Sequence, residues 1–111
     1  MALSADFLRG YTDAIILRQL EREDSYGYLI SKRVSEQSAG GLELKEATLY
    51  TAFRRLESGG LIRSYWGDEG VGARRRYYHL TEEGRARLQA ERAAWAETRE
   101  TINELLREEE T

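Results

Sequence analysis

The sequence contains no cysteine and no proline. Without cysteine the chain can form neither disulfides nor thiolate metal sites, and we expect no metal ion and no cofactor. The sequence also lacks any apolar run approaching the roughly 18 residues of a membrane span. Its first residues lack the basic-then-apolar pattern of a secretory signal, so we expect a cytoplasmic protein. Without proline, glycine and polar capping residues must mark the ends of helices.

Positive charge is scarce overall, because the 111 residues carry a net charge of −3. A chain of this length predicts one domain with at most an appended helix. Residues 45–80 hold seven basic and four acidic side chains, whereas residues 1–44 hold five and seven, and residues 81–111 hold five and nine. The basic middle third is a candidate for nucleic-acid contact, although ordinary surface charge would also account for it.

Apolar residues at helical spacing predict three helices, over residues 7–22, 26–37 and 45–58. The first is apolar on more than one face, which is typical of a helix that packs both on its own domain and on a partner chain. Ser25 is expected to cap the second helix through its hydroxyl. The third is expected to end at Gly59–Gly60, because glycine tolerates the left-handed conformation found after helix ends.

The spacing then changes to that of a β-hairpin, with strands predicted over residues 61–66 and 75–80 around a glycine-rich loop. A long last helix is expected from Thr81, whose hydroxyl would cap it, to about residue 107. Apolar residues recur along it every seven positions, at Leu88, Trp95 and Ile102. This is the pattern of a helix that packs along another helix.

The predicted order is therefore three helices, a hairpin and a long helix. The fold class is mainly α with a two-stranded β wing, which is a winged helix-turn-helix plus one long C-terminal dimerisation helix. We assign residues 1–80 to a DNA-binding domain whose first helix also contributes to a dimer interface. Residues 81–111 are assigned to the dimerisation helix.

In a helix-turn-helix unit the second helix of the pair enters the major groove, and here that is the helix over residues 45–58. Its early exposed positions carry side chains that can reach base edges or a thymine methyl group: Lys45, Ala47, Thr48 and Thr51. Arg54 and Arg55 follow one turn later and are expected to reach phosphates. The alternative is an ordinary amphipathic helix with its polar residues in water.

Three consecutive arginines, Arg74, Arg75 and Arg76, lie beside the glycine-rich loop. A wing needs cationic side chains that pair with phosphate or enter the minor groove. Because alternate residues of a strand face opposite sides, we expect one or two of these arginines on DNA and one packed against the protein. The alternative is a solvated hairpin whose arginines keep the protein soluble.

Several blocks of the chain resemble the PadR family of transcriptional repressors. They are Ser25-Tyr26-Gly27-Tyr28, the run from Glu46 to Glu57, Gly60-Leu61-Ile62, and Tyr77-Tyr78 followed by Leu80-Thr81 and Gly84. Thr51 stands where most members have proline, which together with Trp95 points to a short subgroup that includes a lactococcal multidrug-resistance regulator. The resemblance implies a homodimeric repressor that binds a pseudo-palindromic operator in double-stranded DNA.

The same resemblance implies a planar aromatic, multidrug-type ligand at the dimer interface that releases the repressor from its operator. Trp95 matches a ligand-stacking tryptophan of that subgroup, whereas its aromatic character alone would favour a place in the dimer core. Three residues of the first helix would supply further walls: Phe7, Tyr11 and Ala14. Asp13 could balance a cationic ligand, while Arg99, one turn beyond Trp95, favours a neutral or anionic one.

An enzyme is not expected, because the one histidine, His79, has neither a cysteine nor an arranged acid–base pair to act with. The alternative function is a winged-helix adaptor or dimerisation protein without a ligand response, since fold does not fix function. Wing arginines bonded within the fold, leaving no cationic face, would favour that alternative.

Overall fold

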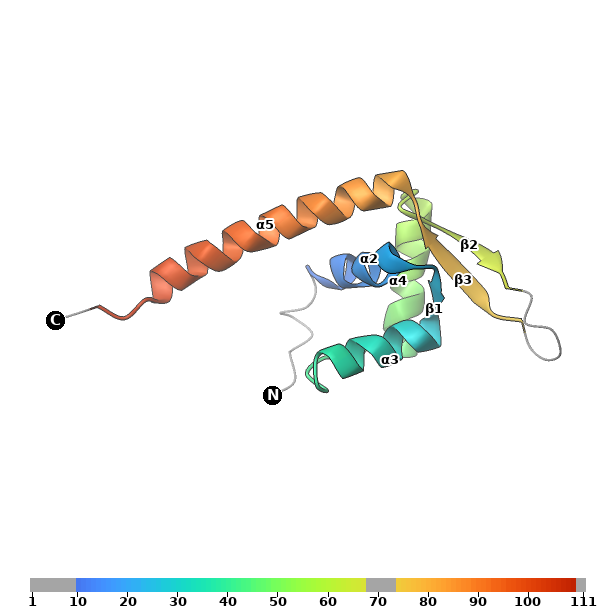
Figure 1. Ribbon diagram of the computed structural model, residues 1–111, viewed down its shortest axis with the longest axis horizontal. Helices are drawn as coiled ribbons and strands as arrows, with labels where there is room; N and C mark the ends of the chain where they lie inside the picture. Colours follow the sequence, from blue (N-terminus) through green and yellow to red (C-terminus); the bar gives the residue numbers. More distant parts are fainter. Residues whose placement is uncertain (1–9, 68–73, 110–111) are drawn as a thin grey trace.

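The computed structural model describes residues 10–67 and 74–109, so Phe7 and the loop at 68–73 lie outside the described residues. The elements in chain order are α2 (Thr12–Arg22), β1 (Ser25–Tyr26), α3 (Gly27–Gln37), α4 (Glu46–Ser58), β2 (Ile62–Trp66), β3 (Arg76–Leu80) and α5 (Glu82–Leu106). They confirm a mainly α fold with a hairpin and a long last helix. Figure 1 shows α2, α3 and α4 gathered beside the sheet, with α5 extending well beyond them.

The first predicted helix is shorter than expected over the described residues. Gly10 and Tyr11 form a turn, and α2 begins at Thr12 with Tyr11 as its N-cap. Glycine loses more backbone freedom in a helix than any other residue, which favours a break at this position. The helix predicted to run without interruption from residue 7 is therefore wrong at Gly10.

The sheet has three antiparallel strands in the order β1-β3-β2, one more than the predicted two-stranded wing. The prediction that Ser25 caps the second helix is wrong, because Ser25 pairs with Tyr78 in β1 and its buried hydroxyl has no partner among the described residues. α3 begins at Gly27 without a side-chain cap. Pairing with β3 gives the buried backbone N–H and C=O groups of this segment hydrogen-bond partners, which a helix cap at Ser25 would not have done.

Alternate residues of β2 and β3 face opposite sides of the sheet. On the core face, Ile62, Tyr78 and Leu80 are buried among the helices. On the other side, Tyr65 stacks on Tyr77 with ring centroids 5.7 Å apart. We call this second side the outer face, and the register places four wing residues on it: Arg63, Tyr65, Tyr77 and His79.

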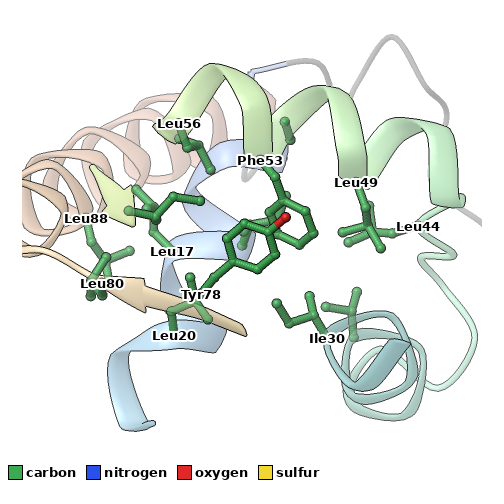
Figure 2. Close-up of a cluster of buried hydrophobic side chains, with 14 of the residues drawn as sticks. Leu17, Leu20, Ile30, Leu44, Leu49, Phe53, Leu56, Tyr78, Leu80 and Leu88 are labelled. Atoms are coloured by element: carbon green, nitrogen blue, oxygen red, sulfur yellow. The ribbon is translucent and has the colours of Figure 1, made fainter. Parts of the chain in front are cut away.

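The core draws apolar side chains from all four described helices and from β2 and β3. Figure 2 shows Phe53 of α4 and Tyr78 of β3 together at its centre, and their stacked rings lie 4.0 Å apart at 20°. Leu42 and Leu44, between α3 and α4, are buried but form no strand. This core fixes α4 on the sheet and so fixes the angle between the predicted recognition helix and the wing.

The start of α5 is tied to the turn between α4 and β2. The Thr81 hydroxyl oxygen accepts a hydrogen bond from the Gly84 backbone N–H at 3.0 Å, which confirms the predicted N-cap. The same hydroxyl donates to the carbonyl of Gly60 at 2.7 Å, and the Thr81 N–H donates to the carbonyl of Leu61 at 3.1 Å. Gly59 caps α4 at its predicted end, and Gly60 follows in the left-handed region at φ 73°.

Beyond its first turns α5 is largely exposed in the single chain. Leu88 is its last buried residue among those described, and Trp95 is 39% exposed. Further along, Ile102, Leu105 and Leu106 are 47%, 73% and 77% exposed. Neither α5 nor any other helix of the described residues is long and apolar enough to cross a membrane. The far half of α5 therefore presents apolar side chains without a covering element among the described residues.

Candidate functional site

One face of α4 is exposed, and the opposite face is buried through Leu49, Ala52, Phe53 and Leu56. Lys45 is the N-cap of this helix, and its backbone is extended there. The exposed face carries five of the side chains predicted to reach DNA: Lys45, Ala47, Thr48, Thr51 and Arg54. Arg54 forms no ion pair with a described residue. The helix thus presents a polar, cationic edge that begins at its N-terminus.

Arg55 lies next to Arg54 but, unlike Arg54, forms an ion pair within the fold. Its Nε donates to the Asp13 carboxylate of α2 at 3.2 Å, and its Nη2 forms a second, shorter bond to the same carboxylate. This hydrogen bonding raises the pKa of the Arg55 guanidinium above its ordinary value. Arg55 was predicted to contact phosphate, and Asp13 to balance the charge of a cationic ligand. Instead, the two side chains form an ion pair between α4 and α2.

The wing is tied to α4 on the core face of the sheet. The Ser64 hydroxyl donates to the Glu57 carboxylate at 2.5 Å, and Arg76 Nη2 donates to the Ser64 hydroxyl at 2.7 Å. Arg76 also lies 3.6 Å from Glu57. These contacts link the last turn of the predicted recognition helix to both wing strands.

The three wing arginines contact two different aromatic rings. Arg74 and Arg76 each lie 5.6 Å from the ring centroid of Trp66, whereas Arg75 lies 4.7 Å from that of Tyr26. A guanidinium at this distance from an aromatic face is attracted by the ring quadrupole. All three arginines remain exposed. The contacts therefore orient the guanidinium groups without removing the cationic surface of the wing.

A groove of about 770 Å³ lies between α3, α4 and the wing. Tyr28 of α3 and Tyr50 of α4 line it and are 72% and 54% exposed, and Trp66 and the three wing arginines line its other side. Neither Tyr28 nor Tyr50 was among the site residues predicted from the sequence. The signal was present, because Tyr50 lies three residues beyond Ala47 and so shares its exposed helix face.

A second groove, of about 480 Å³, lies between α2 and α5. Trp95 of α5 meets Tyr11 edge-on, with ring centroids 5.1 Å apart and planes at 75°. Ala14 and Leu88 also line this groove. Tyr11, Ala14 and Trp95 are thus brought together as the sequence analysis expected, whereas Asp13 and Arg99 are not among the lining residues. We call this space the α2–α5 groove.

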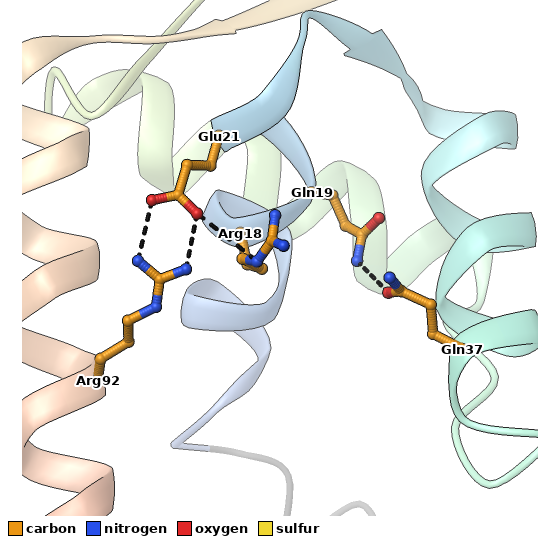
Figure 3. Close-up of polar contacts among 5 residues, drawn as sticks. All are labelled: Arg18, Gln19, Glu21, Gln37 and Arg92. Carbon is orange, nitrogen blue, oxygen red and sulfur yellow. Dashed lines mark hydrogen bonds and ion pairs between the residues drawn. The ribbon is translucent and has the colours of Figure 1, made fainter.

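Polar contacts border the α2–α5 groove (Figure 3). Arg92 of α5 donates two hydrogen bonds to the Glu21 carboxylate of α2, at 2.9 and 2.6 Å, and Arg18 lies 3.5 Å from the same carboxylate. The bonds from Arg92 hold the pKa of Glu21 below its ordinary value. Gln19 donates to Gln37 of α3 at 2.9 Å. The groove therefore has a fixed rim in which two guanidiniums share one carboxylate.

Among residues 10–67 and 74–109 no group of three or more histidine or acidic side chains could hold a metal ion. His79 is paired with Asp24 at 2.8 Å. Neither observation points to catalytic chemistry.

Comparison with known proteins gives a consistent result. A sequence model described as the transcriptional regulator PadR-like family matches residues 16–90. An uncharacterized protein from Lysinibacillus sphaericus is 42% identical over 99 residues, which is 89% of this chain and 91% of that one. A transcriptional regulator from Clostridium thermocellum has a similar structure, with a TM-score of 0.86 and 43% identity over 93% of this chain and all of that one. A PadR family transcription regulator from Clostridium difficile gives a TM-score of 0.77 and 41% identity, over 87% and 99% of the two chains.

Proposed function

The chain belongs to the PadR-like family of transcriptional regulators, and from this we propose that it is a homodimeric repressor that binds a pseudo-palindromic DNA operator. The family acts in transcription and not as enzymes. The observation that carries the proposal is that Tyr50 of α4 and the three wing arginines line one groove. The side chains assigned to DNA on α4 are exposed on the same short helix. A DNA duplex could contact this helix and the wing at once, with the helix in the major groove.

The DNA contacts divide by side-chain chemistry. We assign base-edge contacts to Lys45, Ala47, Thr48 and Thr51 at the start of α4, because these side chains can donate, accept or touch a thymine methyl group. Arg54 and Arg74 are assigned to phosphates. Arg75 and Arg76 are assigned to the wing surface beside Arg74, and Arg55 to the contact between α4 and α2.

The dimer is proposed to form through residues 81–111, with α2 contributing beside them. A second copy of α5 could cover the exposed apolar side chains of Ile102, Leu105 and Leu106. Removing this apolar surface from water would stabilise the dimer. Two-fold symmetry would then place the two α4 helices in successive major grooves about 34 Å apart.

The α2–α5 groove is the proposed ligand site, as in the short multidrug-resistance subgroup. A planar aromatic ring could stack on Trp95, which lies beside Tyr11. The ligand is expected to be neutral or anionic, because Asp13 is held by Arg55 and does not line the groove, while Arg18 and Arg92 share a single carboxylate. Bound ligand would change the angle between the subunits and so the spacing of the two α4 helices.

Titration with the DNA upstream of the protein's own gene tests the repressor proposal. We expect tight binding that weakens on raising the salt concentration, because Lys and Arg contacts release counterions. A saturating planar aromatic ligand should weaken it by about 5- to 150-fold, the usual range of a coupling free energy between sites. Tight binding that ignores every ligand would remove the inducer role but keep the repressor. Equal, poor binding to operator and random DNA would favour the adaptor alternative.

The ligand site is tested by tryptophan fluorescence. The chain has two tryptophans, so the Trp66→Phe variant isolates Trp95. A panel of neutral, anionic and cationic planar dyes should quench this variant, most strongly for the neutral and anionic members. Trp95→Phe with Trp66 retained is the matched control and should show little quenching. An absence of quenching across the panel in the Trp66→Phe variant would contradict the site.

A further inference from the structure

A single carboxylate joins the helical body to both strands of the wing. Asp24 lies between the end of α2 and β1. One of its oxygens accepts a hydrogen bond from the Tyr65 hydroxyl of β2 at 2.6 Å. The other lies 2.8 Å from Nδ1 of His79 in β3. On the opposite face of the sheet, Glu57 of α4 makes the corresponding contact with Ser64 of β2 and Arg76 of β3.

The Asp24 contact lies on the outer face of the sheet, opposite the Glu57–Ser64–Arg76 contact on the core face. Around it the tyrosines form a continuous row, since Tyr65 stacks on Tyr77 at 5.7 Å and Tyr77 meets Tyr26 edge-on at 5.3 Å. The hairpin is thus held from both sides at its root.

The carboxylate of Asp24 is charged over the whole physiological range. Partial burial alone would raise its pKa, but the hydrogen bonds from Tyr65 and His79 outweigh burial and hold the pKa of Asp24 below its ordinary value. In turn, the hydrogen bond to this carboxylate raises the pKa of Tyr65 to about 12. The phenol therefore remains a donor and Asp24 remains an acceptor at any pH used to study DNA binding.

We propose that Asp24 is a positioning residue for DNA binding: it holds the wing in the orientation in which its arginines meet the operator. The proposal rests on the proposed DNA-binding function, and it adds a residue that touches no DNA. Arg76 is the first residue of β3 and Arg74 lies two residues before it, and Asp24 holds this strand through His79. When this contact is lost, the wing is held only on the core face, and the cost of ordering it further on DNA reduces affinity.

Long-range charge predicts the opposite result, which makes the test sharp. Removing a negative side chain from a DNA-binding protein should tighten its binding to phosphate. Asp24→Ala is instead expected to weaken operator binding about fivefold, in line with the loss of hydrogen bonds to a charged group. The matched control is Glu36→Ala, which removes an exposed carboxylate from α3 and should bind the operator as tightly as wild type or slightly more tightly.

Tyr65→Phe gives an independent readout if Asp24→Ala folds poorly, since it removes only one hydroxyl. It should weaken binding in the same direction by about two- to threefold, the value of one such bond. Hydrogen exchange of the free variants should show faster exchange of the β2 and β3 amides and unchanged exchange in α4. Asp24→Ala binding as tightly as Glu36→Ala, with unchanged wing exchange, would overturn the positioning role while leaving the repressor proposal intact.

A double-mutant cycle with His79 separates positioning by this contact from simple structural support. Asp24 is influenced by Tyr65 and Arg63 of β2 and by His79 of β3, and the neighbouring Glu23 is paired with Arg33 of α3 at 2.9 Å. Among these groups, His79 is the one that connects Asp24 to β3, at 2.8 Å.

Asp24→Asn should weaken operator binding more in the wild-type background than in a His79→Gln background, by about threefold, because the contact to β3 is already lost in the second background. An equal loss in the two backgrounds would overturn the part of the proposal that involves His79. Failure of wild type to bind operator would overturn the proposed function itself.

Discussion

Gly84→Ala is expected to lower the free energy of unfolding by about 3 kcal/mol, at the upper end of the usual cost of overpacking. A Cβ at this position would lie 2.1 Å from the carbonyl oxygen of Leu61 and 2.5 Å from Cδ1 of Leu80. The Leu80 side chain can shift, but the Leu61 carbonyl is backbone and accepts the Thr81 N–H. The first turn of α5 must therefore move away from the α4–β2 turn. Thermal unfolding should show a midpoint about 10 °C or more below wild type.

Gly59→Ala is the matched control, because it makes the same chemical change one turn away from the close approach. A Cβ there would lie 3.5 Å from the nearest atom, the carbonyl oxygen of Arg55, and the backbone has φ −80°. Its stability should be equal to wild type or higher by about 0.5 kcal/mol, because alanine restricts the unfolded chain. A Gly84→Ala variant that melts together with Gly59→Ala would mean that α5 does not approach Leu61 as closely as described.

Local signals predicted the helical parts of this fold well. The Thr81 cap and the Gly59–Gly60 end of α4 both depend on residues within a few positions of one another. Ser25 was predicted wrongly because a good local capping residue was also a strand partner of Tyr78, far along the chain. A capping pattern carries no information about a strand that pairs from elsewhere in the sequence.

The sequence predicted which face of α4 is exposed, but not which of its side chains bind other parts of the fold. Helical spacing placed Ala47, Thr51 and Arg54 together on the exposed face of α4. It could not show that Arg55, the next residue, reaches Asp13 42 positions earlier. Both arginines carry the same charge, so only the tertiary packing of α2 against α4 distinguishes them.

That distinction gives the largest expected effect on DNA binding. Arg54→Ala should make the dependence of log affinity on log salt shallower by about 1.8 for a dimer, because one phosphate contact is lost in each half-site. At 0.1 M salt this corresponds to roughly 10- to 100-fold weaker operator binding. Fluorescence anisotropy with labelled operator at four or five salt concentrations measures both values.

Arg55→Ala is the matched control, since it removes the same charge from the adjacent position of the same helix. Long-range electrostatics alone would give the two variants equal affinity and equal salt dependence. We expect Arg55→Ala to keep most of the wild-type salt slope and to lose up to about 1 kcal/mol of stability, because its ion pair with Asp13 is partly exposed. Two variants with the same reduced slope would show that Arg55 leaves Asp13 to contact phosphate when DNA is bound. A slope reduced only in Arg55→Ala would reverse the roles assigned to the two arginines.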